Sequence, residues 1–128
     1  MKLRIKGPSL RLRLTQKEVG ALAAGAVVEE RVPFAGGAEL TYRLRRDAQA
    51  PEPRAEFAGN VLEVLLPEAQ ARDWCASDRV TLAHRQGVPG GGALELTIEK
   101  DFACLAPRAG EDESDHYPHP GAGAGQRC

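Results

Sequence analysis

The sequence predicts an α+β fold in which two similar ββαββ halves form a mainly antiparallel eight-stranded barrel, or barrel-like sheet, with two helices. Three observations lead to this prediction. Short segments alternate apolar and charged residues as half-buried strands do, two segments carry helix-start signals, and the pattern of the first half returns at an offset of 52 residues, as from Leu10 to Leu62. With 128 residues the chain is long enough to bury a core without disulfides.

The first half is expected over about residues 1–46 and opens with a hairpin. Apolar residues alternate with charged ones on both sides of a break at residues 7–9, namely Leu3 and Ile5 before it and Leu10, Leu12 and Leu14 after it. Thr15 with Glu18 three residues later has the pattern of a capping box, so a helix begins there. The buried face of this helix is expected to be Val19, Leu22, Ala23 and Ala26.

Two strands are expected after the helix, at about residues 27–34 and 38–45, joined by a turn at Ala35-Gly36-Gly37. A Pro- and Ala-rich stretch from Asp47 to Pro53 then reads as a loop that leads into the second half.

The second half is expected over about residues 54–100. Its residues correspond to the first half element by element. The two opening strands carry Ala55 and Phe57, then Leu62, Val64 and Leu66. Pro67 stands at the helix start, the helix carries Ala71, Trp74 and Cys75, Val80 takes the place of Val28, and the last strand carries Leu94, Leu96 and Ile98. Trp74 and Cys75 are therefore expected in the core. Residues 1–102 form the predicted domain, and residues 103–128 form a tail that is chemically distinct from it.

This order of elements resembles the duplicated arrangement of the triphosphate-tunnel (CYTH) fold. The resemblance implies phosphate chemistry with a divalent metal held by carboxylates. The first strand departs from that family's Glu-x-Glu-x-Lys, because it reads Lys2-Leu3-Arg4-Ile5-Lys6.

Basic residues dominate the predicted first hairpin. They alternate with apolar residues and therefore share one face, which we call the basic ribbon: Lys2, Arg4, Lys6, Arg11 and Arg13. Because like charges that face each other across strands repel, these side chains must be hydrated, paired with acids such as Glu63, Glu95 or Glu99, or bound to an anion. Arg and Lys together suit phosphate. No aromatic residues are interleaved, as nucleic-acid stacking would require.

The tail carries a set of candidate metal ligands. Two thiols and two imidazoles suit a tetrahedral site for zinc or another divalent transition metal, and they are supplied by Cys104, His116, His119 and Cys128. Two alternatives remain open. Cys104 and Cys128 form a redox-dependent clasp, or the acidic block at residues 111–115 folds back on the basic ribbon and neutralises it.

The tail motifs Lys-Asp-Phe-x-Cys-Leu, from Lys100, and Glu-Asp-x-Ser-Asp-x-Tyr, from Glu111, together with the opening strands, resemble a family of small uncharacterised bacterial proteins. The resemblance covers nearly the whole chain and implies no activity. It also implies that Asn often stands at the positions of His116 and His119. In that case a metal site based on Cys104, Asp112, Asp115 and Cys128 remains.

A small binding protein of the bacterial cytoplasm, rather than an enzyme, is the function that the sequence predicts. The net charge of -1 gives no overall excess that would favour nucleic acid or a membrane surface as partner. No run is long and apolar enough for a membrane helix, and no secretory signal is recognisable. The leading hypothesis is metal binding by the tail. The alternatives are a phosphate-ligand barrel or metal-dependent phosphatase that uses the basic ribbon, and a protein-interaction module.

Overall fold

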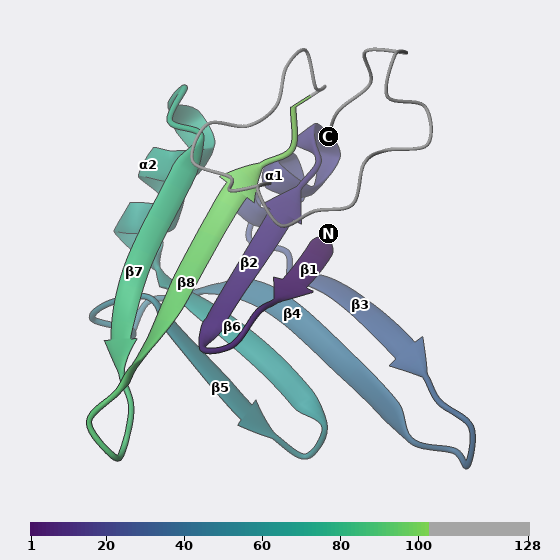
Figure 1. The fold of residues 1–128 in the computed structure, drawn as a ribbon. Coiled ribbons are helices and arrows are strands. Elements are labelled where there is room, and N and C mark those ends of the chain that lie inside the picture. Colours follow the sequence, from purple (N-terminus) through teal and green to yellow (C-terminus); the bar gives the residue numbers. More distant parts are fainter. Residues whose placement is uncertain (103–128) are drawn as a thin grey trace, which may run out of the picture.

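The computed structural model describes residues 1–102, which form eight strands and two helices (Figure 1). The α+β prediction is thus confirmed, and each half contributes two strands, a helix and two further strands. In chain order the elements are β1 (Lys2–Ile5), β2 (Ser9–Leu14), α1 (Gln16–Ala23), β3 (Val28–Pro33), β4 (Glu39–Asp47), β5 (Arg54–Ala58), β6 (Val61–Pro67), α2 (Glu68–Ala76), β7 (Thr81–Gly87) and β8 (Ala93–Lys100).

The strands form two four-stranded sheets. Sheet A has the order β1-β2-β8-β7 and sheet B the order β3-β4-β6-β5. In each sheet the outer pairs are antiparallel and the central pair, β2 with β8 or β4 with β6, is parallel. Each sheet therefore combines one hairpin from the first half with one from the second.

The prediction of a single barrel is wrong. No backbone ladder joins sheet A to sheet B within residues 1–102, so β1, β7, β3 and β5 are edge strands. The physical reason lies in the helices, which act as crossovers: α1 follows β2 of sheet A and leads to β3 of sheet B, and α2 carries the chain back from β6 to β7. Both helices lie behind sheet A in the view of Figure 1.

The two halves have matching topology. Strands β1 to β4 correspond in order to strands β5 to β8. When each strand of sheet A is replaced by its counterpart, the order becomes β5-β6-β4-β3, which is the order of sheet B read from the other edge. The register corrects one expected correspondence: Val28 stands opposite Leu44 and Leu82 stands opposite Ile98, so Leu82 takes the place of Val28, not Val80. Duplication of the sequence itself stays a prediction.

The core lies between the two sheets and the helices. Both helices contribute fully buried side chains, Leu22 from α1 and Trp74 from α2, and the strands contribute alternate residues such as Leu12, Leu44, Leu66 and Ile98. The Trp74 indole N–H donates to the Val80 carbonyl at 3.1 Å, and the Lys100 ammonium lies 5.3 Å from its ring centroid. The placement of Trp74 in the core is confirmed.

Cys75, next to Trp74, is half-buried. Burial raises the pKa of its thiol, against the opposing effect of Lys100 and Arg46. A raised pKa favours the protonated thiol, which is the less nucleophilic form.

Helix α1 is shorter than its apolar pattern predicts. The capping box at Thr15 and Glu18 is confirmed, but the helix ends at Ala23 and the chain then turns at Gly25, whose φ of +94° suits glycine. Ala23 and Ala26 are consequently exposed, and only Leu22 of the predicted apolar face is fully buried. No helix in the described residues has the length and apolar character needed to span a membrane.

Candidate functional site

The basic ribbon lies on the outer face of sheet A. Lys2 stands opposite Arg13, and Arg4 stands opposite Arg11, in the antiparallel register of β1 and β2. Side chains directly opposite each other share a face and lie close together. We call these four residues the basic face. Lys6, the fifth predicted residue, follows β1 in the turn and is exposed.

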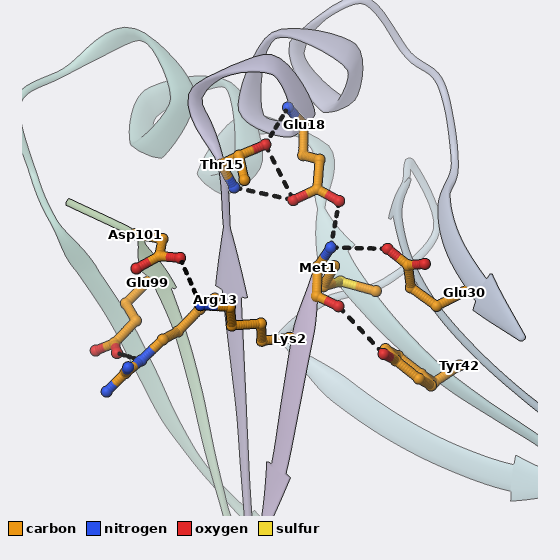
Figure 2. Close-up of polar contacts among 9 residues, drawn as sticks. All are labelled: Met1, Lys2, Arg13, Thr15, Glu18, Glu30, Tyr42, Glu99 and Asp101. Atoms are coloured by element: carbon orange, nitrogen blue, oxygen red, sulfur yellow. Dashed lines mark hydrogen bonds and ion pairs between the residues drawn. The ribbon is translucent and has the colours of Figure 1, made fainter. Parts of the chain in front are cut away.

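Acidic residues from the end of β8 neutralise part of the basic face. The Arg13 guanidinium Nε contacts the Glu99 carboxylate at 2.6 Å, and their side chains are only 18% and 9% exposed. The Lys2 ammonium lies 3.5 Å from the Asp101 carboxylate (Figure 2). The predicted pairing of the ribbon with Glu99 is therefore confirmed, at one end of the ladder.

Two other predicted acidic partners bind different cations. Glu95 stands opposite Ser9 on the same face as the ribbon, and its carboxylate lies 3.3 Å from Arg85 on β7. Glu63 belongs to sheet B, where it accepts hydrogen bonds from Arg43 at 2.8 Å and from Arg45 at 3.0 Å. The pairing of Glu63 with the ribbon was wrong, because the two halves place equivalent strands in different sheets.

On sheet B the arginines of the central strand β4 lie beside carboxylates of the neighbouring strands. The hydrogen bond from Arg45 lowers the pKa of Glu63, desolvation opposes this shift, and Arg43 reinforces it. Glu29 adds contacts to Arg31 at 3.0 Å and to Arg43 at 3.4 Å. The basic face of sheet A differs, because cations there directly oppose cations.

A second polar cluster surrounds the α-amino group of Met1, which lies just before β1, and Figure 2 shows side chains from α1, β3 and β4 directed toward this residue. The amine donates to the Glu18 carboxylate of α1 and, at 2.8 Å, to the Glu30 carboxylate of β3. The Tyr42 hydroxyl of β4 donates to the Met1 carbonyl at 3.1 Å. We call Met1, Glu18, Glu30 and Tyr42 the amine cluster.

The amine cluster stabilises charge in a partly buried position. Burial alone would lower the pKa of the Met1 amine, but the hydrogen bonds to Glu18 and Glu30 outweigh it, so this pKa is raised. Burial would likewise raise the pKa of Glu18, yet the bonds from the amine and from Thr15 leave it lowered. Both groups are therefore held in their charged forms.

Of the amine cluster, sequence reasoning found only Glu18, through the capping box. Met1, Glu30 and Tyr42 had no local signal, because they are brought together by contacts between Met1 and two strands of sheet B, β3 and β4. The separations in sequence are 29 residues for Met1 and Glu30 and 41 for Met1 and Tyr42.

The predicted metal ligands of the tail all lie outside the described residues: Cys104, Asp112, Asp115, His116, His119 and Cys128. The predicted clasp between Cys104 and Cys128 and the acidic block lie outside them too. Within residues 1–102, no three or more His, Cys, Asp or Glu side chains are grouped so that they could hold a metal ion.

Comparison with known proteins gave one match. A family model described as a family of unknown function (DUF7009) matches residues 1–121, which include both halves and most of the tail. No curated protein and no solved structure matches the chain.

Proposed function

We propose that this chain, which belongs to the DUF7009 family of unknown function, is a binding protein whose basic face takes a small phosphate-bearing anion. The observation that supports the proposal is the direct cross-strand opposition of Arg4 and Arg11, with Lys2 and Arg13 in the neighbouring row. Guanidinium groups bind phosphate through paired N–H bonds, and an ammonium group adds a point charge.

Arg4 and Arg11 lie on the face that Lys2 and Arg13 share, so one small anion would contact guanidinium groups from both β1 and β2.

The test is calorimetric titration of the full chain with inorganic tripolyphosphate at low ionic strength, without added metal. Replacing both Arg4→Gln and Arg11→Gln should weaken binding by about tenfold or more, because each charge-assisted hydrogen bond contributes about 1.5 kcal/mol or more. The matched control is Arg31→Gln with Arg54→Gln, which removes the same charge from the outer face of sheet B. The proposal fails if the unaltered chain binds no tripolyphosphate, or if both double variants weaken binding equally.

Metal binding by the tail is the second candidate function. It is supported by the ligand chemistry of Cys104, His116, His119 and Cys128, with Asp112 and Asp115 as further oxygen ligands. Metal analysis of the full chain purified without an affinity tag should find zinc or another divalent transition metal. Cys104→Ser with Cys128→Ser should abolish it, whereas Cys75→Ser, in helix α2, should retain it. Absence of metal, together with an unchanged melting temperature when zinc is added to chelated protein, would end this proposal.

A further inference from the structure

The described part of the chain ends beside the basic face. The Asp101 N–H donates at 2.8 Å to the carbonyl of Leu14, the last residue of β2. The Asp101 carboxylate lies 3.5 Å from the Lys2 ammonium (Figure 2). The tail therefore begins next to the row of the basic face that Lys2 and Arg13 form.

The acidic block of the tail is near enough in sequence to reach the whole basic face. Only residues 103–110 connect it to Phe102. Because an extended chain advances by about 3.3 to 3.6 Å per residue, this connection spans up to about 30 Å. The two rows of the basic face are two residues apart on β1, which corresponds to about 7 Å. The block can therefore lie over both rows.

Charge favours contact between the acidic block and the basic face. The block consists of carboxylates around one serine: Glu111, Asp112, Glu113 and Asp115. On the basic face, cations stand opposite cations in both rows. A surface on which one sign of charge is concentrated attracts segments of the other sign. The end of β8 already follows this pattern, with carboxylates placed against Arg13 and Lys2.

We propose that the acidic block, residues 111–115, docks on the basic face and competes there with the phosphate-bearing anion. The docking depends only on charge and chain connection, whereas the competition rests on the proposed anion binding. A carboxylate accepts paired N–H bonds from a guanidinium group, as a phosphate does. A segment tethered this closely competes at an effective concentration on the order of millimolar. The tail then sets the anion concentration at which the site fills.

Zero-length crosslinking of the full chain with a carbodiimide tests the docking. This reagent joins a lysine amine to a carboxylate that contacts it, and peptide mass spectrometry identifies the joined residues. Lys2 should be found joined to a carboxylate of residues 111–115. The contact between Lys2 and Asp101 is the internal control, because it should crosslink whether or not the block docks. A crosslink to Asp101 without one to the block would overturn the docking.

The double variants of the anion test show whether the block docks on this face in particular. Arg4→Gln with Arg11→Gln should lower the yield of the crosslink to the block at least about threefold, because two guanidinium partners are lost. Arg31→Gln with Arg54→Gln removes the same charge from sheet B and should leave the yield unchanged. Equal yields in the two double variants would also overturn the docking.

Calorimetric titration with tripolyphosphate at low ionic strength tests the competition. One variant neutralises the block: Glu111→Gln, Asp112→Asn, Glu113→Gln and Asp115→Asn. It should bind tripolyphosphate at least about threefold more tightly than the unaltered chain, because the tethered competitor is gone. The matched control neutralises exposed acids elsewhere: Glu39→Gln, Glu56→Gln, Asp73→Asn and Asp78→Asn. It should tighten binding less than the block variant does.

The two measurements distinguish failure of this inference from failure of the proposed function. A crosslink to the block, in a chain that binds no tripolyphosphate with or without the acids of the block, would reject the proposed function and retain the docking. Equal tripolyphosphate affinities of the block variant and its matched control would reject the competition and leave the proposed function standing.

Discussion

The side-chain amide of Gln86 holds both backbone polar groups of Ala55. The amide oxygen accepts the Ala55 N–H at 2.7 Å, and the amide nitrogen donates to the Ala55 carbonyl at 3.0 Å. Gln86 lies on β7 of sheet A and Ala55 on β5 of sheet B, so this pair of bonds takes the place of a ladder rung between two edge strands. It also covers part of an edge that would otherwise be open to another chain.

Gln86→Leu is expected to lower the free energy of unfolding by about 1 to 3 kcal/mol, because the N–H and C=O of Ala55 lose their partners. Urea denaturation monitored by circular dichroism measures the change. Arg85→Ala is the control at the neighbouring exposed position and should stay within about 0.5 kcal/mol of the original chain. A Gln86→Leu variant as stable as the original chain would show that the two hydrogen bonds between Gln86 and Ala55 contribute nothing to the free energy of unfolding.

The amine cluster predicts a stability optimum between about pH 5 and pH 8. The raised pKa of the Met1 amine gives stability that is complete below the ordinary value of about 8 and is lost as the pH rises through the folded-state pKa. The lowered pKa of Glu18 gives stability that is complete above about 4.3 and is lost as the pH falls through the folded-state value.

Urea midpoints measured from pH 3 to pH 9 check this prediction. Tyr42 does not ionise in this range, because burial and the charges of Glu30 and Glu18 raise its pKa. Glu18→Gln should flatten both limbs of the profile, since it removes one titrating group and a partner of the other. Unchanged limbs in this variant would contradict the assignment.

Arg46 is expected to contribute more than Arg72, although both contact the Glu68 carboxylate. Arg46 is 18% exposed, donates to the Ala23 carbonyl at the end of α1 at 3.2 Å, and lies 3.4 Å from Glu68 in the first turn of α2. Arg72 is 67% exposed and makes an (i, i+4) contact at 3.5 Å. Arg46→Met should cost about 1 to 2 kcal/mol and Arg72→Met about 0.5 kcal/mol or less. Thermal denaturation of both variants measures the difference, and equal losses would disprove it.

Arg13 and Glu99 are expected to be strongly coupled. Glu99→Gln alone removes the carboxylate that lies 2.6 Å from Arg13 and should cost about 3 kcal/mol, whereas Arg13→Met combined with Glu99→Leu should be closer to the original stability. The exposed pair Arg85 and Glu95 serves as control, and its coupling energy should stay below about 1 kcal/mol. Denaturant titration of both double-mutant cycles measures these energies. If the two cycles give the same coupling, burial of the Arg13 pair has no energetic effect.

Much of the local structure was predictable. The hairpin of β1 and β2, the start of α1 at Thr15 and the last strand β8 occur where alternation and capping indicate them. The side-by-side placement of the cations on β1 and β2 was also predictable, because it follows from one tight hairpin. These features depend on residues close together in the chain.

Strand pairing across the two halves was not predictable in the same way. A strand that alternates apolar and charged residues can pair in either direction, so nothing in Leu10 or Leu96 alone indicates that β2 and β8 run parallel. The barrel prediction failed at this point. The metal ligands of the tail remain an untested part of the candidate site.

By itself, then, the sequence determined the order of elements, the helix start at Thr15 and the set of cations on the first hairpin, since each rests on short-range periodicity or a local hydrogen bond. Tertiary structure alone decided that the strands divide into two open sheets, that Glu63 lies away from the basic face, and that the Met1 amine lies between Glu18 and Glu30. These outcomes depend on contacts between distant segments, which only packing of the whole chain brings together.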